Sequence, residues 1–374
     1  MDFALNEEQE MLQKSARTFL SRQYSDKLFK QLAQDEKGCP PELWRQIAEM
    51  GWTALGIPEQ YGGIGSFLDI TLVLQEMGRA GFISPFFSSS VVGASVILDA
   101  GSSDQKNRYL PPLAEGKSIV TVALNDSIGQ PQPIPVKAFK TAAGYTISGK
   151  KVLVPDVCVA DYLVCAVHLD ESSGLQPGLG LFMVDSRTNG ITRTFTESIS
   201  GDKYGEVVLD QVKVPVSNLL CDPHQSEACL EKVFEKAAVG LCAQMLGGME
   251  RALEMSVSYA KERIAFGHPI GAYQSIQHRC ANMLMDVESS KYVTYQAAWY
   301  LSEGLPAARE VAIAKAWVSQ ACIRVMTSAQ QIHGAIAFTD DFILHRFTRK
   351  AWANGLTYGD ADFHLENLLK LSSR

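Results

Sequence analysis

The chain has 374 residues, of which 46% are apolar and 20% charged, and its formal net charge is −7. This length allows two or three domains with cores of their own, and the composition is that of a globular protein rather than a disordered or fibrous one. The acidic balance argues against a nucleic-acid groove or an anionic membrane surface as the partner.

No stretch predicts a membrane span or an export signal. The apolar runs fall short of the ~18 residues that a spanning helix needs, and the N-terminus "MDFALNEEQEML" has neither a basic nor an apolar region. Eight cysteines are scattered singly, without a C-x-x-C pair, which favours free thiols in a reducing cytosol over disulfides or a zinc site. We therefore expect a cytoplasmic protein with no membrane, nucleic-acid or metal partner.

Residues 1–116 carry helical signals. Asn6 is placed to cap a helix that begins "EEQEMLQKSARTFL", in which apolar residues recur near the helical period. "PPELWRQIAEMGW" has prolines at its start and Gly51 near its end, the usual asymmetry of a helix. "LDITLVLQEMGRAG" and "SSVVGASVILDAG" are apolar nearly all round, which predicts two further helices inside a bundle.

From residue 117 to about 220 the period of apolar residues changes to two. Short stretches from "SIVTVAL" to "YGEVVLDQVKV" are set off by Gly, Pro, Asp and Asn. Strands at this spacing predict an antiparallel barrel or sandwich.

Beyond residue 220 the helical period returns. Long helices are expected at roughly 227–262, 273–303 and 307–334, followed by a short pair. "AAVGLCAQMLGGMERALEMSV" carries more apolar surface than one bundle buries, which predicts an oligomer. The expected fold class is α+β, with an N-terminal α-helical domain (1–116), a middle antiparallel β domain (117–220) and a C-terminal α-helical domain (221–374).

Two stretches of the last segment are more specific than any propensity. "KERIAFGHPIGAYQSIQ" holds the pattern R-x-x-F-G-x(6)-Q-x-x-Q, which begins at Arg263, and "AQQIHGAIAFT" runs from Ala329 to Thr339. Both resemble the flavin-binding motifs of the acyl-CoA dehydrogenase family, and the resemblance covers essentially the whole chain. It includes "GWTALGIPEQYGG" near the N-terminus and "VKVP" at the close of the middle segment.

The resemblance implies an FAD flavoprotein that assembles as a dimer of dimers. In the family the flavin lies between the middle and C-terminal domains, and a neighbouring subunit completes its adenosine end. A guanidinium group suits the charge of a phosphate, and an amide suits a hydrogen-bonding polar edge. Small residues let the backbone approach a cofactor closely. Ala335 and Ala337 stand where the family usually has glycine, which a helical backbone would tolerate. The cofactor-binding positions that the resemblance implies are Arg263, Phe266, Gln274, Gln331, Gly334 and Ala335.

The resemblance also implies the reaction. Family members remove two hydrogens from adjacent carbons of an acyl-CoA thioester and pass the electrons to an electron-transfer flavoprotein. A carboxylate in a dry pocket takes the proton alpha to the carbonyl, while a hydride leaves the beta carbon for the flavin. The chain is therefore expected to be an FAD-dependent acyl-CoA dehydrogenase.

The usual catalytic base is missing from the sequence. Most of the family carries it as the glutamate of Y-E-G-T, but here the stretch is "YGDA", with Gly359 at the glutamate's position and Asp360 one residue later. A minority carries it in F-x-x-E-R on the first long C-terminal helix, where this chain has Ala237 and Ala238. Glu235 lies about 200° around that helix from residue 237 and is interpreted as a solvated partner of neighbouring lysines.

The middle segment departs from the family too. The family's T-E-P-x-x-G-S-D is replaced by "NDSIGQPQ", which begins Asn125, Asp126, Ser127. "LVP", Leu153 to Pro155, replaces W-I-[ST], which lines one side of the flavin. Because proline offers neither hydroxyl nor amide donor, we expect fewer contacts to the flavin ring than to the adenosine end.

Together these departures resemble subunits of the heteromeric acyl-CoA dehydrogenases that act on steroid side chains and other bulky acyl-CoAs. There two related chains share an α2β2 assembly, and one chain can carry the base while the other completes the flavin site. A homotetramer stays open as the alternative assembly. The small residues of "SPFFSSSVVGAS" (Ser84–Ser95) would leave room for a bulky acyl group, or else mark a tightly packed helix pair.

Two possible roles of Asp360 separate two classes of function. As the general base, Asp360 would make the chain a self-sufficient dehydrogenase. As the N-cap of the helix "ADFHLENLL", it would leave the chain a non-catalytic subunit that supports a partner's active site. We favour the cap, because a base must come within ~3 Å of the proton that it takes, and Asp360 reaches that far only if the turn is rearranged. Acyl-CoA dehydrogenation is then the activity of the complete assembly.

Overall fold

The computed structural model describes residues 4–126, 135–170 and 178–372. The chain forms two compact units, neither of which is continuous in sequence. One comprises Met1–Phe29, Phe67–Phe82 and Ala237–Arg374, and the other comprises Lys30–Ser66 and Ile83–Lys236. The predicted order of helices, strands and helices is confirmed, whereas the partition into three domains stays a prediction. Within these ranges no helix is both long and apolar enough to cross a membrane.

The predicted N-terminal helices are present. Asn6 caps the first of them reciprocally: its side chain accepts the Gln9 N–H (2.8 Å), and its own N–H donates to the Gln9 amide oxygen (3.2 Å). The stretch predicted as one helix from Ser89 begins instead as a π-helical run, Phe87–Gly93. The α-helices are α1 (Glu7–Gln23), α2 (Asp26–Gln34), α3 (Pro41–Glu49), α4 (Phe67–Ala80), α5 (Ala94–Ala100) and α6 (Ser103–Ala114).

The middle segment forms one sheet in the order β1-β4-β2-β3-β7-β6, with β5 added on β4. The sheet is mixed rather than purely antiparallel, because β1 and β2 run parallel to β4. Alternation of apolar residues identifies a strand but does not fix its direction relative to a strand far away in sequence. The strands are β1 (Val120–Ala123), β2 (Lys137–Thr141), β3 (Gly144–Pro155), β4 (Tyr162–Leu169), β5 (Leu179–Asp185), β6 (Ile191–Thr196) and β7 (Tyr204–Val214).

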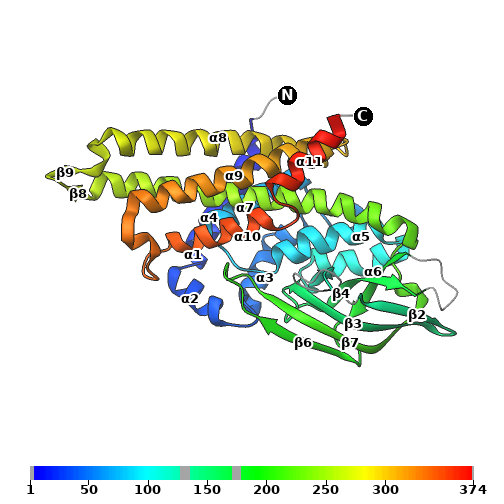
Figure 1. Ribbon diagram of the computed structural model, residues 1–374. Helices are drawn as coiled ribbons and strands as arrows, with labels where there is room; N and C mark the ends of the chain where they lie inside the picture. The colour runs from blue at the N-terminus through cyan, green and yellow to red at the C-terminus, as the bar shows by residue number, and fades with distance from the viewer. Residues whose placement is uncertain (1–3, 127–134, 171–177, 373–374) are drawn as a thin grey trace. The chain divides into compact units, whose positions relative to one another are not determined.

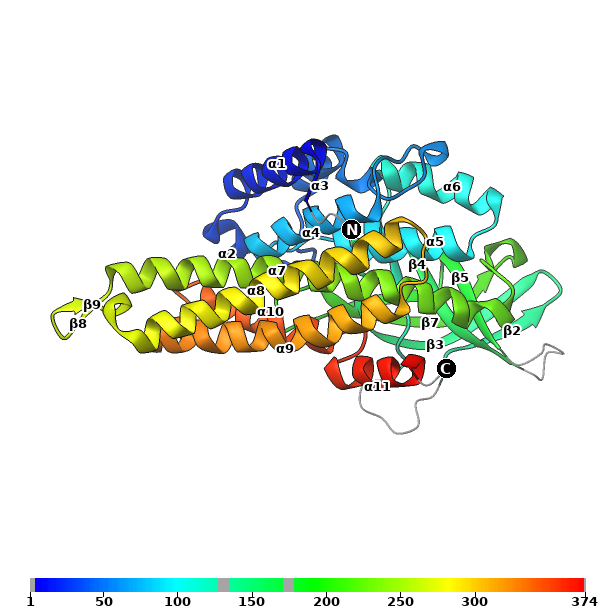
Figure 2. The ribbon, with the colours of Figure 1, turned by 90° about the horizontal axis from the view of Figure 1, so that it is seen from above.

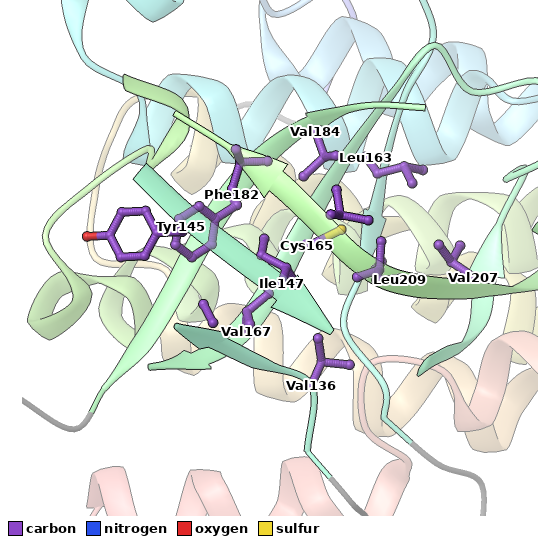
Figure 3. Packing of buried hydrophobic residues seen from close by; sticks show 14 of the residues in the cluster. Val136, Tyr145, Ile147, Leu163, Cys165, Val167, Phe182, Val184, Val207 and Leu209 are labelled. Carbon is purple, nitrogen blue, oxygen red and sulfur yellow. The ribbon is translucent and has the colours of Figure 1, made fainter. Parts of the chain in front are cut away.

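A hydrophobic core of its own stabilises the sheet (Figure 3). Tyr145 and Phe182 meet edge to face, with ring centroids 5.0 Å apart. Cys165 is completely buried beside them, and burial raises the pKa of its thiol to about 12. All eight cysteines lie in the described ranges and are free thiols, as their scattered positions in the sequence predict.

The C-terminal segment forms long helices that agree with the predicted ranges. The second half of α7 runs beside α8 and α9, and a small hairpin, β8–β9, closes the end of the α7–α8 pair (Figures 1 and 2). α9 also packs against α10 and α11. The elements are α7 (Ser226–Glu262), β8 (Ile264–Ala265), β9 (His268–Pro269), α8 (Gln274–Ser302), α9 (Ala308–His333), α10 (Leu344–Leu356) and α11 (Ala361–Ser372).

α4 and α7 cross with their backbones in contact. A Cβ built on Gly247 would lie 1.8 Å from the carbonyl oxygen of Gln75, and one built on Gly78 would lie 2.0 Å from that of Gln244. Real Cβ atoms do not approach a carbonyl oxygen so closely, so the crossing requires glycine on both helices.

Candidate active site

The turn between α10 and α11 holds the sequence "YGDA". Tyr358 (φ 57°) and Gly359 (φ 91°) both adopt left-handed conformations. A non-glycine residue there costs about 1–2 kcal/mol, so surrounding contacts must hold Tyr358. One contact comes from the buried His364, whose Nε2 lies 2.9 Å from the Tyr358 carbonyl oxygen. Burial lowers the pKa of His364, which favours the neutral ring as the donor of this hydrogen bond.

Asp360 caps α11, as predicted. Its Oδ1 accepts the N–H of Phe363 (2.9 Å), and its carbonyl oxygen accepts that of His364 (3.2 Å). The carboxylate is thus bound to its own helix, whose N-terminus favours a negative charge. The role of Asp360 as a general base stays a prediction.

Position 359 has no space for a side chain. A Cβ built on Gly359 would lie 2.4 Å from Cδ1 of Phe363 and 2.8 Å from Nε2 of His364. Its φ of 91° is also one that residues other than glycine rarely adopt. This turn therefore could not accept a glutamate at position 359 without moving both rings and changing the backbone.

The alternative base position on α7 also lacks a carboxylate. Ala237 and Ala238 are both buried. Glu235, just before them, is half-buried, and burial raises the pKa of its carboxyl. The charges of Lys232 and Lys236 oppose this effect, although the Lys236 ammonium forms its ion pair with Asp99 (3.0 Å).

The first flavin-binding motif forms the β8–β9 hairpin and the start of α8. Phe266 (φ 53°) and Gly267 (φ 83°) make the tight turn, as two left-handed residues do in a hairpin. The Phe266 side chain is 92% exposed. Arg263 and Gln274 are exposed as well, and neither side chain has a hydrogen-bonding partner among the residues that the structure describes. These groups are therefore free to bind a ligand or a second chain.

The second motif lies where α9 ends, at the same end of the helices as the hairpin (Figures 1 and 2). Gln331, Gly334 and Ala335 are exposed, and a Cβ on Gly334 would meet no atom within 4 Å. Ala335 and Ala337 lie in a 3-10 turn, Gly334–Phe338, and neither has a positive φ. The backbone is thus helical at both positions, as the expected tolerance of a methyl group requires, and contact of these residues with FAD stays a prediction.

His333, which was not among the predicted site residues, supports this second motif. The residue is buried, and its Nδ1 lies 2.8 Å from the carbonyl oxygen of Ala329. Tyr259 stacks on the ring at 4.6 Å between centroids, and Phe342 contacts it at 4.9 Å. The ring thus fixes the end of α9 immediately before Gly334. The only signal in the sequence was a single histidine in an apolar stretch, which usually indicates nothing more than packing.

"LVP" in the other unit has a well-defined backbone but few polar groups. Leu153 (φ 51°) lies at an irregularity in the pairing of β3 with β7 and is 38% exposed, while Val154 is buried. Pro155 uses its carbonyl oxygen to accept the Thr121 hydroxyl (2.6 Å). The stretch therefore supplies neither the hydroxyl nor the aromatic ring that the family has there.

The polar stretch beside β3 is described only in part. Asn125 bridges to Val152, and the buried Lys151 ammonium pairs with Asp126 and donates to the carbonyl oxygen of Leu124 (3.0 Å). Ser127 and the rest of "NDSIGQPQ" lie outside the described residues.

Comparison with known proteins identifies the family. Residues 6–117 match the model of the acyl-CoA dehydrogenase N-terminal domain, and residues 228–371 match that of the C-terminal domain. The acryloyl-CoA reductase (NADH) of Anaerotignum propionicum is 30% identical over 379 residues, which cover 97% of this chain and 94% of the relative. The chain belongs to the acyl-CoA dehydrogenase family.

Solved structures of family members share its fold. The butyryl-CoA dehydrogenase of Megasphaera elsdenii superposes with a TM-score of 0.90 at 27% identity, covering 100% of both chains. The ChsE4–ChsE5 complex of Mycobacterium tuberculosis gives a TM-score of 0.89 at 26% identity, covering 100% of this chain and 99% of the other.

As a member of this family, the chain is part of an FAD-dependent acyl-CoA dehydrogenase. When bound, FAD supplies the acceptor for the hydride. The described residues fit its adenosine end, where the exposed Arg263 guanidinium suits a pyrophosphate and the open backbone at Gly334 allows close approach. Leu153 and Pro155, where the resemblance implies contact with the flavin ring, have no hydrogen-bonding group in their side chains.

Proposed function

We propose that this chain is one subunit of a heteromeric acyl-CoA dehydrogenase in which a homologous chain carries the catalytic base. The turn at Gly359 carries the proposal, because Phe363 and His364 fill the space that a carboxylate side chain would need. Asp360 beside it is engaged as the cap of α11. The similarity to the ChsE4–ChsE5 complex supports an assembly of two related chains.

The role of this chain would be to bind the adenosine end of FAD. The guanidinium of Arg263 would pair with the phosphate charge of FAD, and the amides of Gln274 and Gln331 would form hydrogen bonds with its polar edges. Gly334, which has no side chain, would let the backbone approach the cofactor closely. Phe266 and Ala335 complete the proposed set of contacts. Since these residues are exposed in the single chain, a second subunit would cover them in the assembly. A homotetramer would cover them equally well but would contain no base at position 359.

The substrate is an acyl-CoA, but the serine-rich stretch Ser84–Ser95 does not support a bulky acyl group. Ser88 donates to Oδ2 of Asp156 (2.6 Å), and Oγ of Ser89 accepts the N–H of Val120 (3.1 Å). A Cβ on Gly93 would lie 2.8 Å from the Val120 carbonyl oxygen. The stretch is therefore tightly packed, but its partners here are β1 and the residue that follows β3 rather than a second helix.

The family suggests the electron acceptor, and the free thiols suggest the cellular compartment. We propose an electron-transfer flavoprotein as the acceptor, as the family resemblance implies. Free thiols persist in a reducing compartment, so we propose the cytoplasm as the location.

Activity of the chain alone and of the co-expressed pair tests this function. We expect the purified pair to bind FAD and to reduce a ferrocenium acceptor with an acyl-CoA, because the partner provides the base. The chain alone should show less than about one hundredth of that turnover, since a general base contributes 10²–10⁴-fold. Butyryl-, octanoyl- and branched acyl-CoA esters, assayed side by side, would identify the acyl group.

Two results would contradict the proposal. Full turnover by the chain alone would make it a self-sufficient dehydrogenase with Asp360 as the remaining candidate base. A pair that binds neither FAD nor acyl-CoA would remove the proposed assembly altogether.

A further inference from the structure

Lys315 lies in the middle of α9 with its side chain completely buried, which is unusual for a lysine. Its ammonium donates to the carbonyl oxygens of Asn354 (3.0 Å), Gly355 (3.0 Å) and Gly359 (2.9 Å). Oγ of Ser319, one turn along α9, lies 3.3 Å away. Three carbonyl oxygens match the three N–H donors of an ammonium group.

These three carbonyls belong to the end of one helix and to the turn that follows it. Asn354 and Gly355 lie in the last turn of α10, where carbonyl groups have no partner inside the helix and a positive charge is favourable. Gly359 lies beyond the helix, in the left-handed part of the turn. One buried ammonium therefore ties the end of α10 to the turn.

His364 completes the arrangement from α11. It binds the carbonyl oxygen of Tyr358, so Lys315 and His364 together hold two successive carbonyls of the turn. Tyr358 and Gly359 both have a left-handed backbone conformation. Because Tyr358 is not a glycine, the surrounding contacts must hold it in that conformation. The ammonium of Lys315 is the group that spans both sides of that strained residue.

We propose that Lys315 is a positioning residue that fixes the turn between α10 and α11 and thereby sets where Gly359 and Asp360 lie in the assembled enzyme. The effect on the assembled enzyme rests on the function proposed above. Removal of the ammonium would take its donor from two buried carbonyl groups, Asn354 and Gly355, and from the partly buried carbonyl of Gly359, and each loss costs free energy. The turn would then open to water rather than keep its left-handed conformation.

Amide hydrogen exchange on the full chain tests the positioning role without any assay of activity. Lys315→Met removes all three donors, and Lys315→Gln keeps a neutral side chain with two. We expect exchange in peptides from residues 354–364 to rise at least ~10-fold in the methionine variant and by less in the glutamine variant. Peptides from α1 and the β sheet should exchange as in the wild type. Lys261→Met, an exposed lysine of α7, is the matched control.

The second arm measures the co-expressed pair. With Lys315→Met we expect kcat, KM for acyl-CoA and FAD content all to stay within about twofold of the wild-type pair, because the displaced turn carries neither the base nor the FAD-binding groups. Unchanged exchange at 354–364 in both Lys315 variants would overturn the positioning role. Raised exchange together with a loss of FAD would overturn it as well, since the change would then not be confined to the turn. An inactive wild-type pair would instead count against the proposed function.

Discussion

Replacing Gly247 by alanine is expected to lower the free energy of unfolding by about 3 kcal/mol or more, because the new methyl group would lie 1.8 Å from the carbonyl oxygen of Gln75. The second nearest group is the backbone nitrogen of Arg79, at 2.6 Å, so no side chain can move aside to relieve the contact. α4 would have to shift away from α7 along the whole crossing.

The next residue supplies the matched control for this substitution. A Cβ on Gly248 would meet Cε of Met326 at 3.6 Å, an ordinary contact with a flexible side chain. Gly248→Ala should therefore be neutral, or stabilise by up to about 1 kcal/mol through helix propensity. Urea unfolding of both variants measures the difference. Equal stability of the two variants would show that α4 and α7 are not in backbone contact.

Exchanging Lys315 for methionine is expected to remove a pH dependence of stability between pH 8 and about 10.5. Burial lowers the pKa of Lys315 from 10.5 to about 8. In this window the unfolded chain binds more protons at this lysine than the folded chain does, so the stability of the wild type rises with pH relative to the variant. Over the whole window the difference should grow by about 3 kcal/mol, since one pKa unit corresponds to about 1.4 kcal/mol.

Wild type and variant differ only at Lys315. The ionisable groups that face it, which are Asp360 in the turn, Cys242 on α7 and His364 on α11, all remain in the variant. The free energies of unfolding of wild type and variant should be measured at half-unit steps of pH, with Lys261→Met as the control. A difference that stays flat or falls with rising pH would contradict the burial of a protonated lysine at this position.

The sequence predicted the elements of this protein better than it predicted their contacts. Asn6, the prolines before α3 and the long apolar periods act locally, so the helices that they indicate are present. The direction of β1 and β2 relative to β4 depends on pairing across long loops, which alternation does not encode. The same holds for the crossing of α4 and α7, which rests on two glycines far apart in the chain.

In the candidate site, too, local features could be predicted and contacts between distant residues could not. The absence of a glutamate at Gly359 and the cap at Asp360 could be predicted, because both belong to one short stretch. The filling of that space by Phe363 and His364 could not be predicted, since it depends on how α11 leaves the turn. Lys315 was missed because a lysine in an apolar helix usually extends its ammonium to water. Here it meets carbonyl groups about forty residues away in the chain instead.

Asp360→Asn in the co-expressed pair tests most directly the claim that this chain supplies no base. Asparagine caps a helix about as well as aspartate but cannot take a proton from a carbon, so the substitution separates the two roles of the residue. We expect a turnover within about twofold of the wild-type pair, and a loss of at least ~10² when the aligned carboxylate of the partner chain is replaced by its amide. A comparable loss in Asp360→Asn, with FAD content and melting temperature unchanged, would make Asp360 the base and contradict the proposed function.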